Sequence, residues 1–134
     1  MRKFREPERN QLILMAHIDL NSVAPIGSAV RTIDEFIKNL DTSAIEKEYA
    51  LDSLTGRYPI HPKTILKVSL FAIHNCRFSL RKMEDDTEWN LAYRWLTGNL
   101  IIDHSTIGKF LIKNREYVED LFTQVVNKRN FGWC

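Results

Sequence analysis

The sequence predicts an all-α protein, a compact multi-helix domain of about five to six helices. Apolar residues recur at intervals of three and four along most of the chain, which is the period of a helix with one buried side. Residues that begin and end helices stand at the limits of these segments, and no segment alternates apolar and polar residues long enough to make a sheet. A chain of 134 residues, 44% hydrophobic and 27% charged, is long enough for one domain with a buried core and short for two.

The first 27 residues are predicted to form an extended N-terminal arm. They show no sustained apolar period, and they contain Pro7, Pro25 and Gly27, which interrupt regular structure. We therefore divide the chain into an arm, residues 1–27, and a helical domain, residues 28–134.

The arm carries an apolar run and a small group of cations. Residues 12–16 are apolar and are expected to form a single strand-like or docked segment. The cations form a basic cluster with two readings, an arm that contacts phosphate groups or a solvated mobile tail. They are Arg2, Lys3, Arg5 and Arg9.

Two helices are predicted in the first part of the helical domain. Ser28 can cap the first, which runs to about Leu40 with apolar residues at helical spacing. Residues 41–43, Asp-Thr-Ser, can cap a short second helix. Residues 53–59 contain a glycine and a proline and are predicted to be a loop.

The next helix is predicted to run from Pro62 to about Cys76. Proline suits the first turn of a helix, where its missing N–H leaves no hydrogen bond unmade. Apolar residues cover more than one side of this segment, so it should be the central, largely buried helix.

Three further helices follow. The first is capped by Ser79 and runs to about Glu88, and the second spans residues 90–96 and ends at Gly98, a residue suited to a left-handed cap. Asp103 caps the last helix, which carries one apolar stripe and, if unbroken to residue 128, would be ~38 Å long.

Three large aromatic residues near these short helices are expected to fill the core, because large aromatics dominate small cores. They are Trp89, Tyr93 and Trp95.

No active site is visible in the sequence. The acidic residues of segment 84–88 have no histidine at ligand spacing, and a polar, solvated helix side explains them better than a metal site. His74 and Cys76 lack the second ligand pair that structural zinc needs. We expect no catalytic residue, no metal and no cofactor in this chain, which is therefore not an enzyme by itself.

Residues 79–113 are the better functional candidate, because three successive helices there could form a helix-turn-helix. In that arrangement His104, Ser105 and Thr106 lie at the start of the last helix, near base edges and at the positive end of its dipole. The alternative is an ordinary helix start capped by Asp103, with solvated lysines behind it. The candidate DNA-binding residues are Arg81, Lys82, Arg94, His104, Ser105, Thr106, Lys109 and Lys113.

The overall charge permits DNA binding without requiring it. The chain carries 19 basic and 17 acidic residues, a net charge of +2, and the excess lies in the C-terminal half. Cys76 and Cys134 do not make a disulfide framework and are interpreted as reduced thiols. Neither an export signal nor a membrane span is visible, so a cytoplasmic, nucleoid-associated protein is expected.

Four motifs, taken together, resemble the amino-terminal domain of DDE-type insertion-sequence transposases of the InsH-like class. They are His61-Pro62-Lys63, Ser79-Leu80-Arg81-Lys82-Met83-Glu84, Tyr93-Arg94-Trp95-Leu96-Thr97-Gly98 and Asp103-His104-Ser105-Thr106-Ile107. The resemblance covers roughly residues 4 to 128. Leu111 departs from it, since such sequences often carry an arginine there, and residues 127–134 do not match the usual passage into the next domain.

The resemblance implies a helical domain that precedes an RNase H-like catalytic domain, in which three acidic residues bind two divalent metals. The first catalytic aspartate is expected beyond the end of this chain, so no residue here inherits a catalytic role.

From the residues and the resemblance, we expect a DNA-binding and assembly module that recognises the terminal inverted repeats of double-stranded DNA in transposition. Two alternatives stay open, an interaction domain that forms a homodimer through the last helix and a truncated remnant with no present function. No membrane and no small-molecule substrate are expected as partners.

Overall fold

The structure, a computed structural model, describes residues 4–5, 7, 9, 12–13, 18–25, 27–51 and 60–128. In these residues the chain forms seven α-helices, one 3-10 helix and a hairpin of two very short strands, so the prediction of an all-α domain is confirmed and the helix count rises. The helices are α1 (Ala29–Lys38), α2 (Ser43–Leu51), α3 (Pro62–His74), α4 (Leu80–Trp89), α5 (Leu91–Thr97), α6 (His104–Lys113) and α7 (Arg115–Lys128). The smaller elements are β1 (Leu12–Ile13), β2 (Ile18–Asp19) and the 3-10 helix Leu20–Val23.

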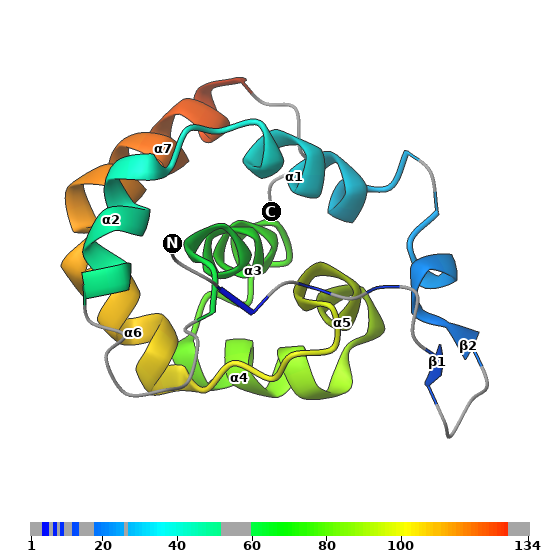
Figure 1. Ribbon diagram of the computed structural model, residues 1–134. Coiled ribbons are helices and arrows are strands. Elements are labelled where there is room, and N and C mark those ends of the chain that lie inside the picture. The colour runs from blue at the N-terminus through cyan, green and yellow to red at the C-terminus, as the bar shows by residue number, and fades with distance from the viewer. Residues whose placement is uncertain are drawn as a thin grey trace.

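The helix α3 is central, as its broad apolar pattern predicts. It lies in the middle of the molecule, surrounded by other helices (Figure 1), and α1, α2, α4, α5 and α6 all contact it. Its side chains from Thr64 to Ala72 are buried. Pro62 occupies the first turn, and the ring Nδ1 of His61 caps the helix by accepting the backbone N–H of Lys63 at 3.0 Å.

Two of the predicted caps are present. The carboxylate of Asp103 accepts the N–H of Thr106 at 2.8 Å at the start of α6. Gly98 ends α5 in the left-handed conformation, with φ of 63°. In contrast, Ser28 and Ser79 stand at the N-caps of α1 and α4 without a capping hydrogen bond from their hydroxyls.

The last predicted helix is two helices, because α6 and α7 are separated at Asn114. The Asn114 backbone departs from helical geometry, and its side-chain amide donates to the Phe110 carbonyl at 3.1 Å. Asparagine competes for backbone hydrogen bonds in this way, which weakens a helix interior. The apolar stripe continues across the break, and Val118, Leu121 and Val125 of α7 are buried in the same core as α6.

The aromatic residues divide between core and surface. Tyr93 and Trp95 on α5 are buried, as predicted, but Trp89 is 77% exposed, so its expected place in the core was wrong. The reason is that α4 ends at Trp89 and only Asn90 separates it from α5, so the side chain projects from the corner between the two helices.

Parts of the predicted arm are described. Arg5 forms a parallel bridge with Ile60, which precedes α3, and β1 pairs with β2 in an antiparallel hairpin. Of the predicted strand-like run 12–16, the first two residues are β1 and the others lie outside the described residues, as do loop residues 53–59. The division of the chain at residue 27 stays a prediction.

Cys76 follows α3 with φ of 58° and is disulfide-bonded, so its interpretation as a reduced thiol was wrong. Whether a thiol finds a partner depends on tertiary proximity, which the sequence does not give. Cys134 lies outside the described residues. Within the described part of the chain, no helix is both long and apolar enough to cross a membrane.

Candidate nucleic-acid interface

Helices α4 and α6 lie against each other in opposite directions. Leu80 at the start of α4 is beside Gly108, where a Cβ would come within 3.1 Å of the Leu80 side chain. One turn along α4, Glu84 meets His104 at the start of α6. The close approach at Gly108 brings the two helices together, and it leaves the other side of α6 to the solvent.

The His104 side chain is held by Glu84 rather than presented outward. Its ring Nδ1 lies 2.7 Å from Glu84 Oε1, and its backbone N–H donates to the same oxygen at 2.8 Å. These two hydrogen bonds lower the pKa of the Glu84 carboxyl. The predicted base-reading role of His104 would therefore require this pair to separate.

The solvent side of α6 carries three of the predicted residues. Ser105, Lys109 and Lys113 are exposed and follow one another at intervals of four, so they form one row along the helix. The opposite side is fixed in the core by Ile107 and Phe110, both fully buried. Thr106 is half-buried, beside the row rather than in it.

The predicted cations outside α6 have different environments. Arg81 is exposed on α4 beside the residues that contact α6, whereas Lys82 projects from the far side of that helix. Arg94 of α5 is half-buried and donates from Nε to the Asn99 side chain at 2.6 Å. Of these three cations, only Arg81 stands next to the α4 residues that contact α6.

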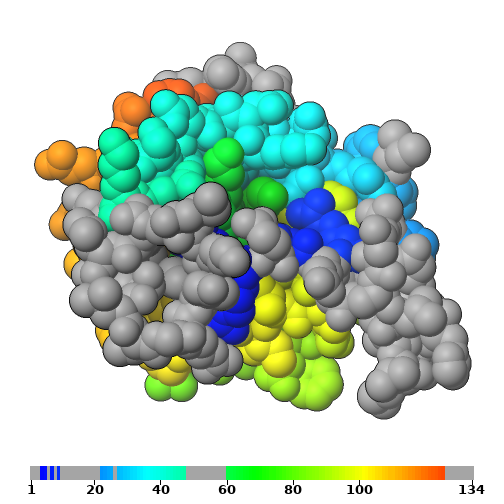
Figure 2. Space-filling view, in the orientation of Figure 1, coloured from blue at the N-terminus to red at the C-terminus, as the bar shows by residue number. Residues whose placement is uncertain are grey.

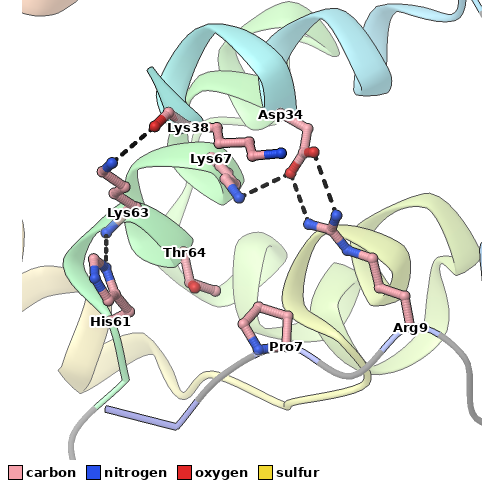
Figure 3. Close-up of a pocket in the computed structure, with 8 residues that line it drawn as sticks. All are labelled: Pro7, Arg9, Asp34, Lys38, His61, Lys63, Thr64 and Lys67. Atoms are coloured by element: carbon pink, nitrogen blue, oxygen red, sulfur yellow. Dashed lines mark hydrogen bonds and ion pairs between the residues drawn. The ribbon is translucent and has the colours of Figure 1, made fainter. Parts of the chain in front are cut away.

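A cluster that the sequence reasoning missed ties the arm to α1 and α3. Arg9 and Lys67 both bind the Asp34 carboxylate, with N–O distances of 2.7 and 2.8 Å (Figure 3). The Arg9 guanidinium also lies 4.2 Å above the Trp95 ring and donates to the Trp95 carbonyl at 2.9 Å. The solvated-tail reading is therefore wrong for Arg9, although Arg2 and Lys3 lie outside the described residues.

Burial and the contacts within this cluster act in opposite directions on the pKa values of Asp34 and Lys67. Burial alone would raise the pKa of Asp34, but hydrogen bonds from Lys67 and Arg9 outweigh it, and the pKa falls below its ordinary value. Burial lowers the pKa of Lys67, and Asp34 opposes that change. In Figure 2 the described arm residues (blue) lie on the surface between α1 (cyan) and the yellow residues near position 100.

An apolar groove of about 500 Å³ lies where α6 and α7 meet the segment before α4. Phe78, Leu111, Val118 and Phe122 line it, and the rings of Phe78 and Phe122 meet edge to face at 6.3 Å. Phe78 is 50% exposed. Apolar side chains open to solvent in this way are typical of an interaction surface.

Among the described residues, no group of three or more histidine, cysteine, aspartate or glutamate side chains is placed to hold a metal ion. The acidic side chains of α4 instead have separate environments. Asp86 binds Arg77 at 2.8 Å, Glu84 binds His104, and Asp85 is exposed.

Most of the chain matches the model of a known protein family. Residues 18–113 match a family model described as Transposase domain (DUF772), which is more than two thirds of the chain. The matched segment begins at β2 and ends at the last residue of α6, so it contains α1 to α6. No curated protein and no solved structure matches.

Proposed function

Because this chain belongs to the transposase domain family (DUF772), we propose that it is a DNA-binding module that recognises the ends of its element in transposition. The exposed row Ser105, Lys109 and Lys113 on α6 carries the proposal. We assign no cutting or joining of strands to the described residues.

The row suits a helix that lies in the major groove. Its lysines are spaced by one turn and can each neutralise a phosphate, while the Ser105 hydroxyl near the helix start can reach a base edge. Ile107 and Phe110 hold the opposite side in the core, so the row keeps a fixed orientation relative to the domain. Arg81, beside the row on α4, adds a flanking phosphate contact.

In this proposal α4, α5 and α6 act as a helix-turn-helix, with α6 as the recognition helix and α4 as its brace. The Glu84–His104 pair and the close contact at Gly108 join brace and recognition helix. An acidic α4 would be repelled by DNA if it lay along the backbone, so only its first turn, at Arg81, comes near phosphates.

The start of α6 does not serve as the phosphate site that its dipole alone would suggest. Two of the backbone N–H groups in its first turn already donate to side chains. The N–H of His104 donates to Glu84, and the N–H of Thr106 donates to Asp103. Both acceptors are carboxylates, and the hydrogen bond from Thr106 lowers the pKa of Asp103. Phosphate contacts must therefore come from side chains further along the helix.

The proposal is tested by measuring whether the protein binds duplexes from the element ends more tightly than other duplexes. Fluorescence anisotropy would compare labelled duplexes from the DNA flanking the gene with scrambled duplexes of the same length. We expect tighter binding to the flanking duplex, and we expect Ser105→Ala to reduce that preference while leaving binding to scrambled DNA unchanged, because hydroxyls read bases and lysines hold phosphates. Equal affinity for both duplexes would remove the end-recognition part of the proposal.

A second candidate function, self-association, rests on the apolar groove. The predicted dimer stripe on the last helix is mostly used inside the domain, where Ile107, Phe110 and Val125 are buried. The apolar surface proposed to bind a second copy is therefore the groove, with Phe78 and Phe122 at its edge. A homodimer through this surface would place two DNA-binding modules in one assembly.

A further inference from the structure

A small polar pocket lies between the arm, α1 and the start of α3 (Figure 3). Its volume is about 250 Å³, below the roughly 300–1,000 Å³ of pockets that hold drug-sized ligands. The pocket therefore has room for a small group rather than a large organic molecule. Its lining residues belong to the arm, to α1 and to α3 with the residue before it, and none belongs to α6, which carries the row proposed to read DNA.

The pocket has an excess of positive charge. Four cations line it, and a single carboxylate, that of Asp34, faces them, which leaves a formal charge of +3. The cations are Arg9, Lys38, Lys63 and Lys67. Asp34 binds Arg9 and Lys67 and cancels one of their two charges, so Lys38 and Lys63 carry two of the three uncompensated charges.

These two lysines have donors to spare. The Lys63 ammonium donates to the backbone carbonyl of Lys38 at 2.9 Å, which uses one of its three hydrogens. The Lys38 ammonium has no hydrogen bond or ion pair with any described residue. Nearby, His61 uses Nδ1 to accept the Lys63 N–H, and its Nε2 lies 3.4 Å from Glu46.

Thr64 adds a hydroxyl donor to the lining of the pocket. It is only 2% exposed, and its hydroxyl lies in the pocket and makes no hydrogen bond with the described part of the chain (Figure 3). The hydroxyl oxygen itself stays open to the pocket, because it is not among the buried side-chain atoms that lack a hydrogen-bond partner. It can therefore donate to an acceptor atom there.

We propose that this pocket binds a phosphate group. Lys38, Lys63 and Thr64 donate to its oxygens, and Arg9 and Lys67 hold Asp34 and contribute to the positive field. A phosphate offers several acceptor oxygens around a compact negative charge, which matches ammonium groups and a hydroxyl arriving from two helices. The same chemistry serves a phosphate of the DNA backbone and a free phosphate.

The site is tested first with inorganic phosphate. Sodium phosphate is titrated into ¹⁵N-labelled protein at neutral pH and constant ionic strength, and amide shifts are followed by NMR. We expect saturable shifts at residues 38, 63 and 64, which Lys38→Gln/Lys63→Gln abolishes. The control Lys47→Gln/Lys82→Gln removes the same charge from exposed positions elsewhere and should keep them.

Thr64 is tested separately, because its substitution leaves the charge unchanged. Thr64→Val should weaken phosphate binding about tenfold or more, since a hydrogen bond to a charged group is lost, whereas Thr64→Ser should retain it. Non-saturating shifts in the wild-type protein, or equal losses in the charge-matched control, would overturn the proposal.

A duplex titration separates the two sources of phosphate. If Lys38→Gln/Lys63→Gln also weakens duplex binding and lowers its salt slope by about 1, the group is a backbone phosphate. If duplex binding is unchanged while inorganic phosphate binding is lost, the ligand is a free phosphate. The proposal does not depend on α6, because Lys109→Ala/Lys113→Ala should leave phosphate binding at the pocket unchanged.

Discussion

Glu84 Oε1 accepts the backbone N–H of His104 at 2.8 Å, and Nδ1 of the same histidine lies 2.7 Å from that oxygen. One carboxylate of α4 therefore holds both the backbone and the ring at the start of α6. Because an ionised carboxylate can only accept, the histidine carries its hydrogen on Nδ1 in this pair. The contact fixes the orientation of the helix to which we assign DNA recognition.

The Glu84–His104 pair makes stability depend on pH. His104 lowers the Glu84 pKa below its ordinary 4.5, so the pair's contribution is complete above pH 4.5 and is lost as pH falls through the lower, folded-state pKa. Urea unfolding of wild-type protein and Glu84→Gln should therefore differ most near pH 6 and converge toward pH 3. Asp85→Asn, an exposed neighbour, is the control. A difference that does not change with pH would contradict this account.

The Asp34 cluster should be more sensitive to substitution. Asp34→Asn leaves the Lys67 ammonium buried without its ionic partner, which costs about 3 kcal/mol of unfolding free energy. Replacing Lys67 as well, in Asp34→Asn/Lys67→Met, should recover part of that loss. Urea denaturation at neutral pH measures both. A loss below about 1 kcal/mol for Asp34→Asn would mean that the pair is not formed in solution.

Gly98 should resist replacement by residues with a Cβ. Its φ of 63° is left-handed, and that conformation costs an ordinary residue about 1–2 kcal/mol. Gly98→Ala should lower the unfolding free energy by about this amount, and Gly98→Asn by less, because asparagine tolerates the left-handed region. Thermal and urea unfolding of both variants provide the measurement, and equal losses would contradict the conformational explanation.

Self-association through the groove predicts a concentration-dependent mass. Sedimentation analysis of the 15.7 kDa chain should show a shift toward twice that mass as concentration rises, and Phe78→Ser should remove the shift. Trp89→Ser is a matched control, because Trp89 is also an exposed aromatic residue but lies at the far end of α4. A wild-type mass that stays monomeric at every concentration would exclude this candidate function.

Local signals in the sequence predicted much of the fold. Pro62, Gly98 and Asp103 each act through a few neighbouring residues, and all three stand where helices were expected to begin or end. The wide apolar pattern of residues 62–76 correctly predicted the central buried helix. The apolar pattern did not predict the break at Asn114. The apolar stripe continues from α6 into α7, and only one residue between them departs from helical geometry.

The candidate site was less predictable, because it depends on contacts between distant residues. Arg9 is 25 residues from Asp34 and 86 from Trp95, so nothing in the local sequence indicates that an arm cation is drawn into the fold. The same limit applies to His104, whose partner Glu84 precedes it by 20 residues. Ser105, Lys109 and Lys113 were all among the candidates predicted from the sequence, but there Ser105 was grouped with His104 and Thr106. The structure separates it from them by exposure and places it in one row with the two lysines.

The most direct test of DNA recognition by α6 is the salt dependence of binding to element-end duplexes, measured by fluorescence anisotropy between about 50 and 200 mM salt. We predict that affinity falls steeply with salt and that Lys109→Ala/Lys113→Ala weakens binding and reduces the log–log slope by about 2, one for each phosphate contact. The control Lys47→Glu, at an exposed lysine of α2, makes the same total change of charge and should match the wild-type protein. Absence of binding at 50 mM, or equal losses in the two variants, would contradict the account.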